Sequence, residues 1–175
     1  GDTGDMKWVT GLYYLSIDTD YSQGLAGSPT TFFLGGEENN TLVSLETESY
    51  SVFGQVDYSL SDSVVLVGGL RYTREDKDFI GNVYQNTNTN DRIIEIDTTT
   101  TSLETLEDTN DQNLWSAKLQ LEYSVGDSLY YVGVNRGVKA GSFNAPLMGG
   151  FSQYKPEELT AYEASLKHSF MQGSG

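Results

Sequence analysis

Apolar and polar residues alternate along several stretches of this chain, a period of two that is typical of β-strands with one apolar face. The alternation is clearest at 114–123, where every second residue from Trp115 to Tyr123 is apolar and the residues between them are polar. The same period predicts six strands in all, at about residues 7–17, 48–60, 64–74, 114–123, 128–138 and 160–170. In the first of these strands both faces are largely apolar, so the pattern alone leaves its facing open.

Two of the connections between these strands are short and nearly identical. The phrase Tyr58-Ser59-Leu60-Ser61-Asp62-Ser63 returns as Tyr123-Ser124-Val125-Gly126-Asp127-Ser128, each time between two strands. The other connections are long, so short turns alternate with long loops, as they do in outer-membrane barrels. The prediction is an all-β fold: an antiparallel up-and-down transmembrane β-barrel segment of about six strands, with long extracellular loops and short periplasmic turns.

The spacing of tyrosines fits the thickness of a membrane. Tyr50 and Tyr58 are separated by a rise of about 26 Å along an extended strand. Tilted by about 40°, this distance projects to roughly 20 Å, close to the ~25 Å apolar band of such barrels. We therefore expect Tyr58 and Tyr123 in the periplasmic aromatic girdle and Tyr50 and Tyr72 in the outer one. A half-buried soluble sheet would show the same alternation and stays open as an alternative.

Composition and charge exclude several classes of protein. Only 37% of the 175 residues are hydrophobic, and no apolar run approaches the ~20 residues of a transmembrane helix. The absence of Cys excludes disulfides and thiolate metal sites, and the net charge of −15 argues against nucleic acid as a partner. Most of that charge lies in the segments 18–48 and 75–112, which we place in the long loops. Such loops either stay solvated or attract cationic ligands or divalent ions.

The sequence offers little for catalysis or metal binding. His168 is the only histidine, and we expect it on the apolar side near the end of the last strand, with Arg136 near the rim of the barrel. Residues 108–113 imitate the start of a calcium loop but lack its Gly and its bidentate Glu, which favours a plain acidic loop. The glycines of 68–69 and 148–150 lack the setting of a phosphate-binding loop. We predict that the protein is not an enzyme, and we assign no catalytic, cofactor-binding or metal-binding residue.

Four phrases carry a resemblance to a known family over most of the chain from Trp8 onward. They are residues 49–58, 68–77, 136–144 and 154–163, with the sequences SYSVFGQVDY, GGLRYTREDK, RGVKAGSFN and YKPEELTAYE. Their order and spacing resemble the barrel of TonB-dependent outer-membrane receptors. The resemblance implies a 22-stranded barrel plugged by an N-terminal domain, which takes up scarce nutrients such as iron–siderophore complexes, haem or cobalamin with energy delivered through TonB.

Because six strands are fewer than the eight a single-chain barrel needs, we expect residues 1–175 to be one part of such a barrel, without the plug domain and the remaining strands. The resemblance implies an outer membrane of a Gram-negative bacterium as the location. It also implies membrane lipid and lipopolysaccharide, TonB and the plug domain, and a small-molecule or metal-chelate ligand as partners. Two alternatives stay open: a non-transport outer-membrane barrel or adhesin, and a soluble β-sandwich that binds carbohydrate.

Five polar residues would then face the interior of the barrel: Arg71, Lys118, Gln120, Glu122 and Lys167. We expect them to form the polar inner wall of the barrel, which packs against a plug. Direct contact with a substrate is the lesser alternative. No ligand-binding residue can be assigned from the sequence.

Overall fold

The computed structural model describes residues 1–26, 38–86, 100–147 and 149–169. In these ranges no helix is long and apolar enough to cross a bilayer. Six strands form one antiparallel sheet: β1 (Met6–Ala26), β2 (Glu38–Ser61), β3 (Val64–Asn86), β4 (Thr100–Val125), β5 (Ser128–Lys139) and β8 (Glu157–His168). Two short strands, β6 (Ser142–Asn144) and β7 (Ser152–Tyr154), pair with each other in a second sheet.

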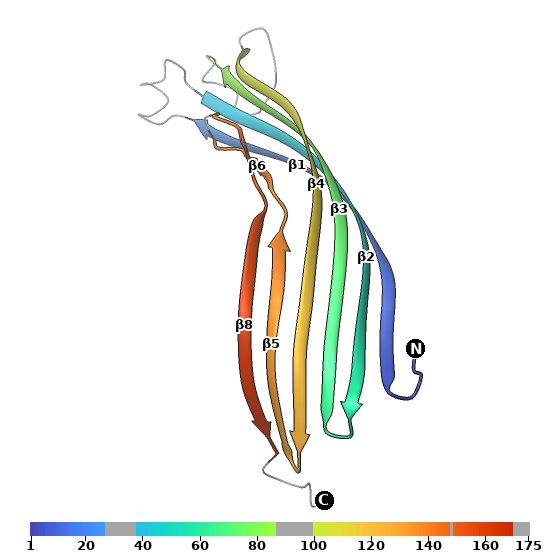
Figure 1. Cartoon of the computed structure of the whole chain (residues 1–175). Coiled ribbons are helices and arrows are strands. Elements are labelled where there is room, and N and C mark those ends of the chain that lie inside the picture. Colours follow the sequence, from blue (N-terminus) through green and yellow to red (C-terminus); the bar gives the residue numbers. More distant parts are fainter. Residues whose placement is uncertain (27–37, 87–99, 148, 170–175) are drawn as a thin grey trace, which may run out of the picture.

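The six long strands lie side by side in the order in which they follow along the chain (Figure 1). This up-and-down arrangement confirms the predicted all-β fold class and the six strands of the sheet. The turns β2–β3 and β4–β5 lie at one end of the sheet, which we call the turn end, and β1 and β3 end, and β2 and β4 begin, at the opposite end, which we call the loop end (Figure 1). Neighbouring strands are sequential, so the topology needs no crossover.

Both short turns occur where the repeated phrase predicts them, but they differ in backbone geometry. Gly126 has a φ of +55°, a left-handed conformation that a residue without Cβ adopts at little cost. The equivalent residue of the first turn is Ser61, and there the register shifts between Ser59 and Ser61 instead. Within the described residues no amino acid other than Gly has a positive φ. The two copies therefore close the same kind of hairpin in two ways.

Four strands are much longer at the loop end than the sequence pattern predicts. β1 continues to Ala26 and β3 to Asn86, while β2 begins at Glu38 and β4 at Thr100. The prediction that 18–48 and 75–112 are loops was therefore wrong for most of both segments. Beyond the apolar band the face that carries Tyr50 and Tyr72 becomes polar, and the buried apolar residues Val43, Phe79 and Val83 lie on the opposite face, while the backbone pairing continues. β5 and β8 keep bounds close to the predicted ones, and Phe170 lies outside the described residues.

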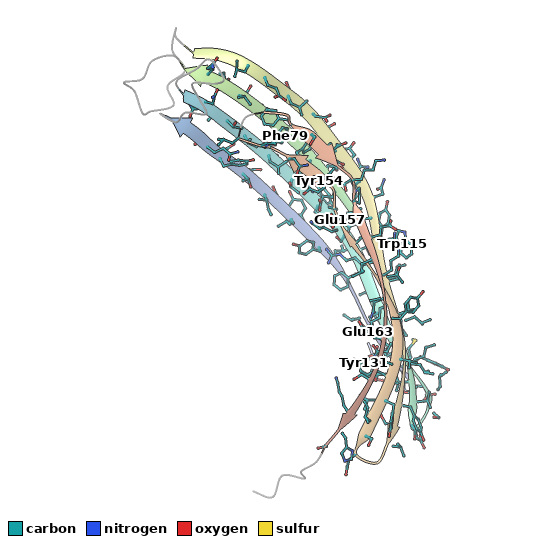
Figure 2. The ribbon with its side chains drawn as sticks, turned by 90° about the vertical axis from the view of Figure 1, so that its left-hand side faces the viewer. Phe79, Trp115, Tyr131, Tyr154, Glu157 and Glu163 are labelled. Atoms are coloured by element: carbon teal, nitrogen blue, oxygen red, sulfur yellow. The ribbon has the colours of Figure 1, made fainter. Side chains whose placement is uncertain are left out.

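The register places alternate residues on two faces of the sheet. We call the face that carries Tyr50, Tyr72 and Trp115 the outer face, and the opposite one the inner face. Pairing of Trp8 with Val56 settles the open facing of β1, because it puts Trp8 on the outer face. Figure 2 shows Trp115 on the convex side of the curved ribbon, while Glu163 and Tyr131 lie on the concave side. The inner face is thus the concave one.

Large apolar side chains cover the outer face without any protein packed on them. The exposed fractions of Leu12, Leu70 and Leu119 are 85%, 59% and 52%. The few buried apolar residues, such as Val67, Phe79 and Leu114, lie instead on the inner face. An apolar surface of this extent requires an apolar partner or solvent.

Candidate binding surface on the inner face

Aromatic side chains on the outer face gather at two levels. At the first level Tyr14 and Tyr50 are cross-strand partners with ring centroids 4.9 Å apart, and Tyr72 pairs with Trp115. Near the turn end Tyr123 and Tyr130 pair, with ring centroids 6.3 Å apart. These are the two levels at which the sequence predicted aromatic girdles, and between them the outer face is apolar. This is the pattern of a barrel wall that faces lipid.

Arg136 lies at the first of these levels, three residues before β5 ends at Lys139. Its guanidinium lies 3.6 Å from the ring centroid of Trp115 and also donates to the Trp115 carbonyl oxygen. Glu158 on β8 pairs with the same guanidinium at 2.5 Å. The aromatic ring and the carboxylate together compensate a charge that would otherwise be costly beside an apolar surface. The pairing depends on β8, which sequence periodicity cannot place beside Arg136.

Beyond the first aromatic level the outer face becomes strongly acidic. Two cross-strand rows of carboxylates run over the sheet. One contains Asp18, Glu46 and Asp78, and the other contains Glu48, Asp76 and Asp111. Arg74 relieves part of this charge through Asp76, at 3.2 Å. The change from apolar to acidic residues marks the level at which the sheet leaves an apolar medium and enters water.

Polar and charged residues line the inner face of the turn-end half. The five predicted wall residues, Arg71, Lys118, Gln120, Glu122 and Lys167, all lie on this face. Several of these residues are held by neighbours: the Gln120 amide donates to Glu122 at 2.5 Å, and the Lys167 ammonium lies 5.8 Å from the Tyr131 ring centroid. The inner face is therefore polar and the outer face apolar, as the alternation predicts.

The connection between β5 and β8 does not extend away from the sheet. Residues 140–147 and 149–156, including β6 and β7, fold onto the inner face of the loop-end half, and we call them the inner hairpin. Phe79 of β3 is its anchor: the Phe79 ring stacks on Phe143 with centroids 4.6 Å apart and meets Phe151 edge-on at 5.6 Å. Phe79 is only 2% exposed. A residue predicted to lie in an acidic loop is therefore a core residue.

Side chains from several strands hold the backbone of the inner hairpin. The Gln112 amide donates to the Gly141 carbonyl at 3.0 Å, and the Gly141 amide donates back at 2.6 Å. Glu104 accepts from the amides of Gly150 and Phe151, at 2.7 and 3.1 Å. Thr41 donates to the Leu147 carbonyl at 2.6 Å. Because every one of these contacts uses a polar side chain on the inner face, the hairpin is docked in a defined position.

Gly141 is needed where the inner hairpin begins. A Cβ at this position would collide with the carbonyl oxygen of Tyr154 across the hairpin.

On β3, Lys77 is buried and forms an ion pair with Glu75. Burial lowers the pKa of Lys77, and the Glu75 carboxylate is its ion-pair partner.

A pocket of about 340 Å³ opens on the inner face next to the start of the hairpin. Arg71, Thr73 and Glu75 of β3 line one side, and Leu114, Val138 and Ala140 line another. We call it the Arg71 pocket. The sequence predicted Arg71 on the polar face, but it did not reveal a pocket beside it.

The structure also places the other residues that the sequence analysis considered for metal, phosphate or catalytic sites. Residues 108–113 belong to β4, so their assignment to a loop was wrong; pairing with β3 supplies their backbone hydrogen bonds. Gly68 and Gly69 are strand residues of β3. Met148 lies outside the described residues, and Gly149 and Gly150 are loop residues with φ of +85° and +79°. His168 lies at the turn end on the expected apolar side, 2.8 Å from the Ser128 hydroxyl. In the described part of the chain no group of three or more His, Asp or Glu is arranged to hold a metal ion.

An antiparallel sheet with an apolar outer face, two aromatic levels and a polar inner face defines this chain as a segment of a membrane β-barrel. Residues 1–175 match the family model described as "TonB dependent receptor-like, beta-barrel". The chain therefore belongs to the TonB-dependent receptor β-barrel family, which confirms the resemblance seen in the sequence.

A solved structure supports the same fold. The ferric yersiniabactin uptake receptor FyuA from Yersinia pestis superposes with a TM-score of 0.76 at 16% sequence identity. The match covers 97% of this chain and 24% of the receptor, so the chain spans about a quarter of that protein's length. No curated protein is similar enough to count as a relative.

Proposed function

We propose that residues 1–175 are one part of the barrel of a TonB-dependent transporter in the outer membrane of a Gram-negative bacterium. In the complete protein a plug domain and further strands would accompany this segment. The observation that carries the proposal is the opposite chemistry of the two faces of one sheet, with apolar residues outside and polar residues inside. The family membership supports the same conclusion.

The free edges of the sheet support a larger barrel. Within the described residues β1 pairs only with β2 on one side, and β8 pairs only with β5. In lipid each unpaired backbone group costs several kcal/mol, so spanning sheets are closed. We infer that strands elsewhere in the same polypeptide pair with both edges. Orientation follows from the connections: the turn end would face the periplasm and the loop end the cell exterior.

The inner hairpin favours transport over adhesion. An adhesin presents its long connections outward, whereas residues 140–156 fold inward against Phe79 and Gln112. A connection in this position narrows the loop end of the barrel and contributes to the surface that an incoming molecule meets. A soluble β-sandwich is disfavoured because no second sheet covers the outer face in the described ranges, where Leu12 is 85% exposed.

The proposed cargo is a scarce nutrient such as an iron–siderophore complex, haem or cobalamin, taken up with energy from TonB. The structural neighbour is named as a ferric yersiniabactin uptake receptor, which supports ferric complexes as the first class to test. Membrane lipid and lipopolysaccharide would contact the outer face. We propose a transport role and no enzymatic one.

The test is uptake by cells that carry or lack the full-length gene. Iron-starved cells are given ⁵⁵Fe-yersiniabactin, ⁵⁵Fe-haem and ⁵⁷Co-cobalamin, and accumulation is compared between the wild type, the gene deletion and a strain without TonB. We expect uptake of one of the three compounds to be lost both in the gene deletion and in the strain without TonB. The plasmid-borne gene should restore this uptake in the deletion strain. Unchanged uptake of all three in the deletion strain, combined with reduced attachment to surfaces, would favour the adhesin alternative.

A further inference from the structure

An open groove of about 530 Å³ lies on the outer face at the first aromatic level, across β1, β2 and β3. We call it the Arg74 groove. Its outer-face side chains form two cross-strand rows of three, the row nearer the loop end given first: Tyr14, Tyr50 and Arg74, then Leu12, Val52 and Tyr72. Apart from Arg74 and the tyrosine hydroxyls these side chains are apolar, so the groove suits a hydrocarbon chain.

Hydrogen bonds hold the aromatic walls of the groove in place. The hydroxyls of Tyr14 and Tyr50 both donate to the Glu48 carboxylate, at 3.1 and 3.2 Å. The Tyr72 hydroxyl donates to the side-chain oxygen of Asn113 at 2.8 Å. Each tyrosine hydroxyl has a single hydrogen to donate. The three rings are therefore fixed, and none of their hydroxyls has a donor left for a ligand.

Small residues continue the groove toward the middle of the apolar band. The next row toward the turn end holds Thr10 and Gly54. The Thr10 hydroxyl donates to the Phe53 carbonyl oxygen at 2.9 Å, so the polar group at this level has a partner. A Cβ at Gly54 would meet only the Val9 carbonyl oxygen, at 3.6 Å, which means that no side chain fills the space over Gly54. A chain that begins beside Arg74 can therefore continue along this row.

Arg74 supplies the unused donors of the groove. Its Nε donates to both carboxylate oxygens of Asp76, each at 3.2 Å. The two Nη groups have no acceptor among the described residues, and the side chain is 59% exposed. On the described outer faces of β1 to β4, Arg74 is the only basic residue. Two free Nη groups form a fork that matches two oxygens of a phosphate.

The groove ends where the sheet leaves the apolar medium. The next row toward the loop end consists of carboxylates: Glu48, Asp76 and Asp111. An amphiphile at this level places its chain in the groove and its charged head beside Arg74, at the height of the aromatic belt. Because the carboxylates repel an anion from the loop-end side, the head approaches Arg74 from the membrane side. Divalent cations that screen these carboxylates favour its binding.

We propose that the Arg74 groove binds lipid A, the phosphorylated and acylated glycolipid that anchors lipopolysaccharide, with an acyl chain between Tyr50 and Tyr72 and a phosphate on the Nη groups of Arg74. The choice of lipid A rests on the proposed function, because it requires the loop end to face the cell exterior, where lipopolysaccharide forms the outer leaflet. It adds one defined site to the general contact of the outer face with lipid.

The test measures binding of ¹⁴C-labelled lipid A to the full-length protein. Tagged protein in detergent is immobilised on beads with magnesium present, and the bound label is counted over a range of lipid concentrations. We expect Arg74→Gln to raise the apparent Kd by about tenfold or more, because the charge-assisted bonds to the phosphate are lost. Arg74→Lys should fall between, since it keeps the charge without the fork. Dephosphorylated lipid A should bind the wild type about as weakly as intact lipid A binds Arg74→Gln.

Arg136→Gln is the matched control, because Arg136 is also an outer-face arginine of this level but its guanidinium is already paired with Glu158. It should leave lipid A binding unchanged. Val52→Trp fills the groove and keeps Arg74, so it should weaken binding through the acyl chain alone. Folding of each barrel is checked by its shifted mobility on unheated gels; if Arg74→Gln does not fold, Arg74→Lys decides the question. Unchanged binding in either folded groove variant would overturn the proposal.

Competition separates lipid A from other sources of phosphate. Unlabelled lipid A should displace the label, whereas inorganic phosphate lacks the chain and phosphatidylglycerol carries only a singly charged phosphodiester, so both should displace it poorly. Equal displacement by phosphatidylglycerol would indicate a site for any anionic lipid and overturn the assignment to lipid A. If the wild type supports no TonB-dependent uptake, the proposed function fails, while the dependence of lipid A binding on Arg74 still reports on this groove.

Discussion

Removing the ring of Phe79 should release the inner hairpin without unfolding the sheet. Phe79 is 2% exposed and contacts Phe143 and Phe151 at centroid distances of 4.6 and 5.6 Å. Each aromatic pair contributes about 0.5–1.5 kcal/mol beyond simple burial. Two lost pairs in Phe79→Ala therefore weaken docking by about 1–3 kcal/mol, or roughly 5- to 150-fold, and the lost burial adds to this. The paired backbone of the long strands is unaffected.

Hydrogen exchange of the full-length protein in detergent micelles reads out this docking. The amides of Gly141, Gly150 and Phe151 bond to Gln112 and Glu104 only while the hairpin is docked. We expect these amides to exchange at least about tenfold faster in Phe79→Ala, because each ~1.4 kcal/mol of lost docking free energy raises the open population about tenfold.

Ile80→Ala is the control, because Ile80 is the next residue of β3 but is 44% exposed on the outer face. In Ile80→Ala the amides of Gly141, Gly150 and Phe151 should exchange at the wild-type rate. Unchanged exchange in folded Phe79→Ala would refute the assignment of Phe79 as the anchor. Equal acceleration in both variants would show a general loss of stability instead.

Three further predictions concern the two faces of the sheet. Spin labels at Leu119 and Lys118 of the parent protein in bilayers should report lipid and water, respectively, by their accessibility to oxygen and to a nickel chelate; one common medium would contradict the assignment of faces. Leu119→Arg should destabilise the barrel by about 2–4 kcal/mol in urea unfolding, whereas Lys118→Arg should have little effect, because the Arg at 119 faces the middle of the bilayer. Asp78→Asn should stabilise the barrel by about 0.2–1 kcal/mol by relieving repulsion from Glu46 across the strands, and 1 M salt should abolish the gain; a gain that persists in salt would point to another cause.

The turns and the membrane-spanning parts of the strands followed from local sequence. Alternation from Trp115 to Tyr123 identifies β4 and its faces because side chains of a strand point to opposite sides in turn. The repeated phrase identifies both hairpins because a short turn is specified by adjacent residues. The tyrosine spacing gave the correct aromatic levels for the same reason, since distance along a strand is proportional to residue number.

The extent of the strands could not be predicted in the same way. The acidic residues from Asp18 onward and around Asp76 interrupt the apolar face that the pattern follows, yet they continue β1 and β3. Backbone pairing with a neighbouring strand supplies their hydrogen bonds whatever the side chains are. A method that relies on hydrophobic alternation detects only the part of a strand that separates lipid from water.

The sequence by itself determined that this chain forms a sheet with one apolar and one polar face, because both properties repeat over neighbouring residues. Only the tertiary structure decided what lies on the polar face. The stacking of Phe79 on Phe143 and the bonds between Gln112 and Gly141 both depend on strand register and on the inward course of residues 140–147 and 149–156. These contacts join residues that are distant in the chain, and no local pattern encodes which of them meet.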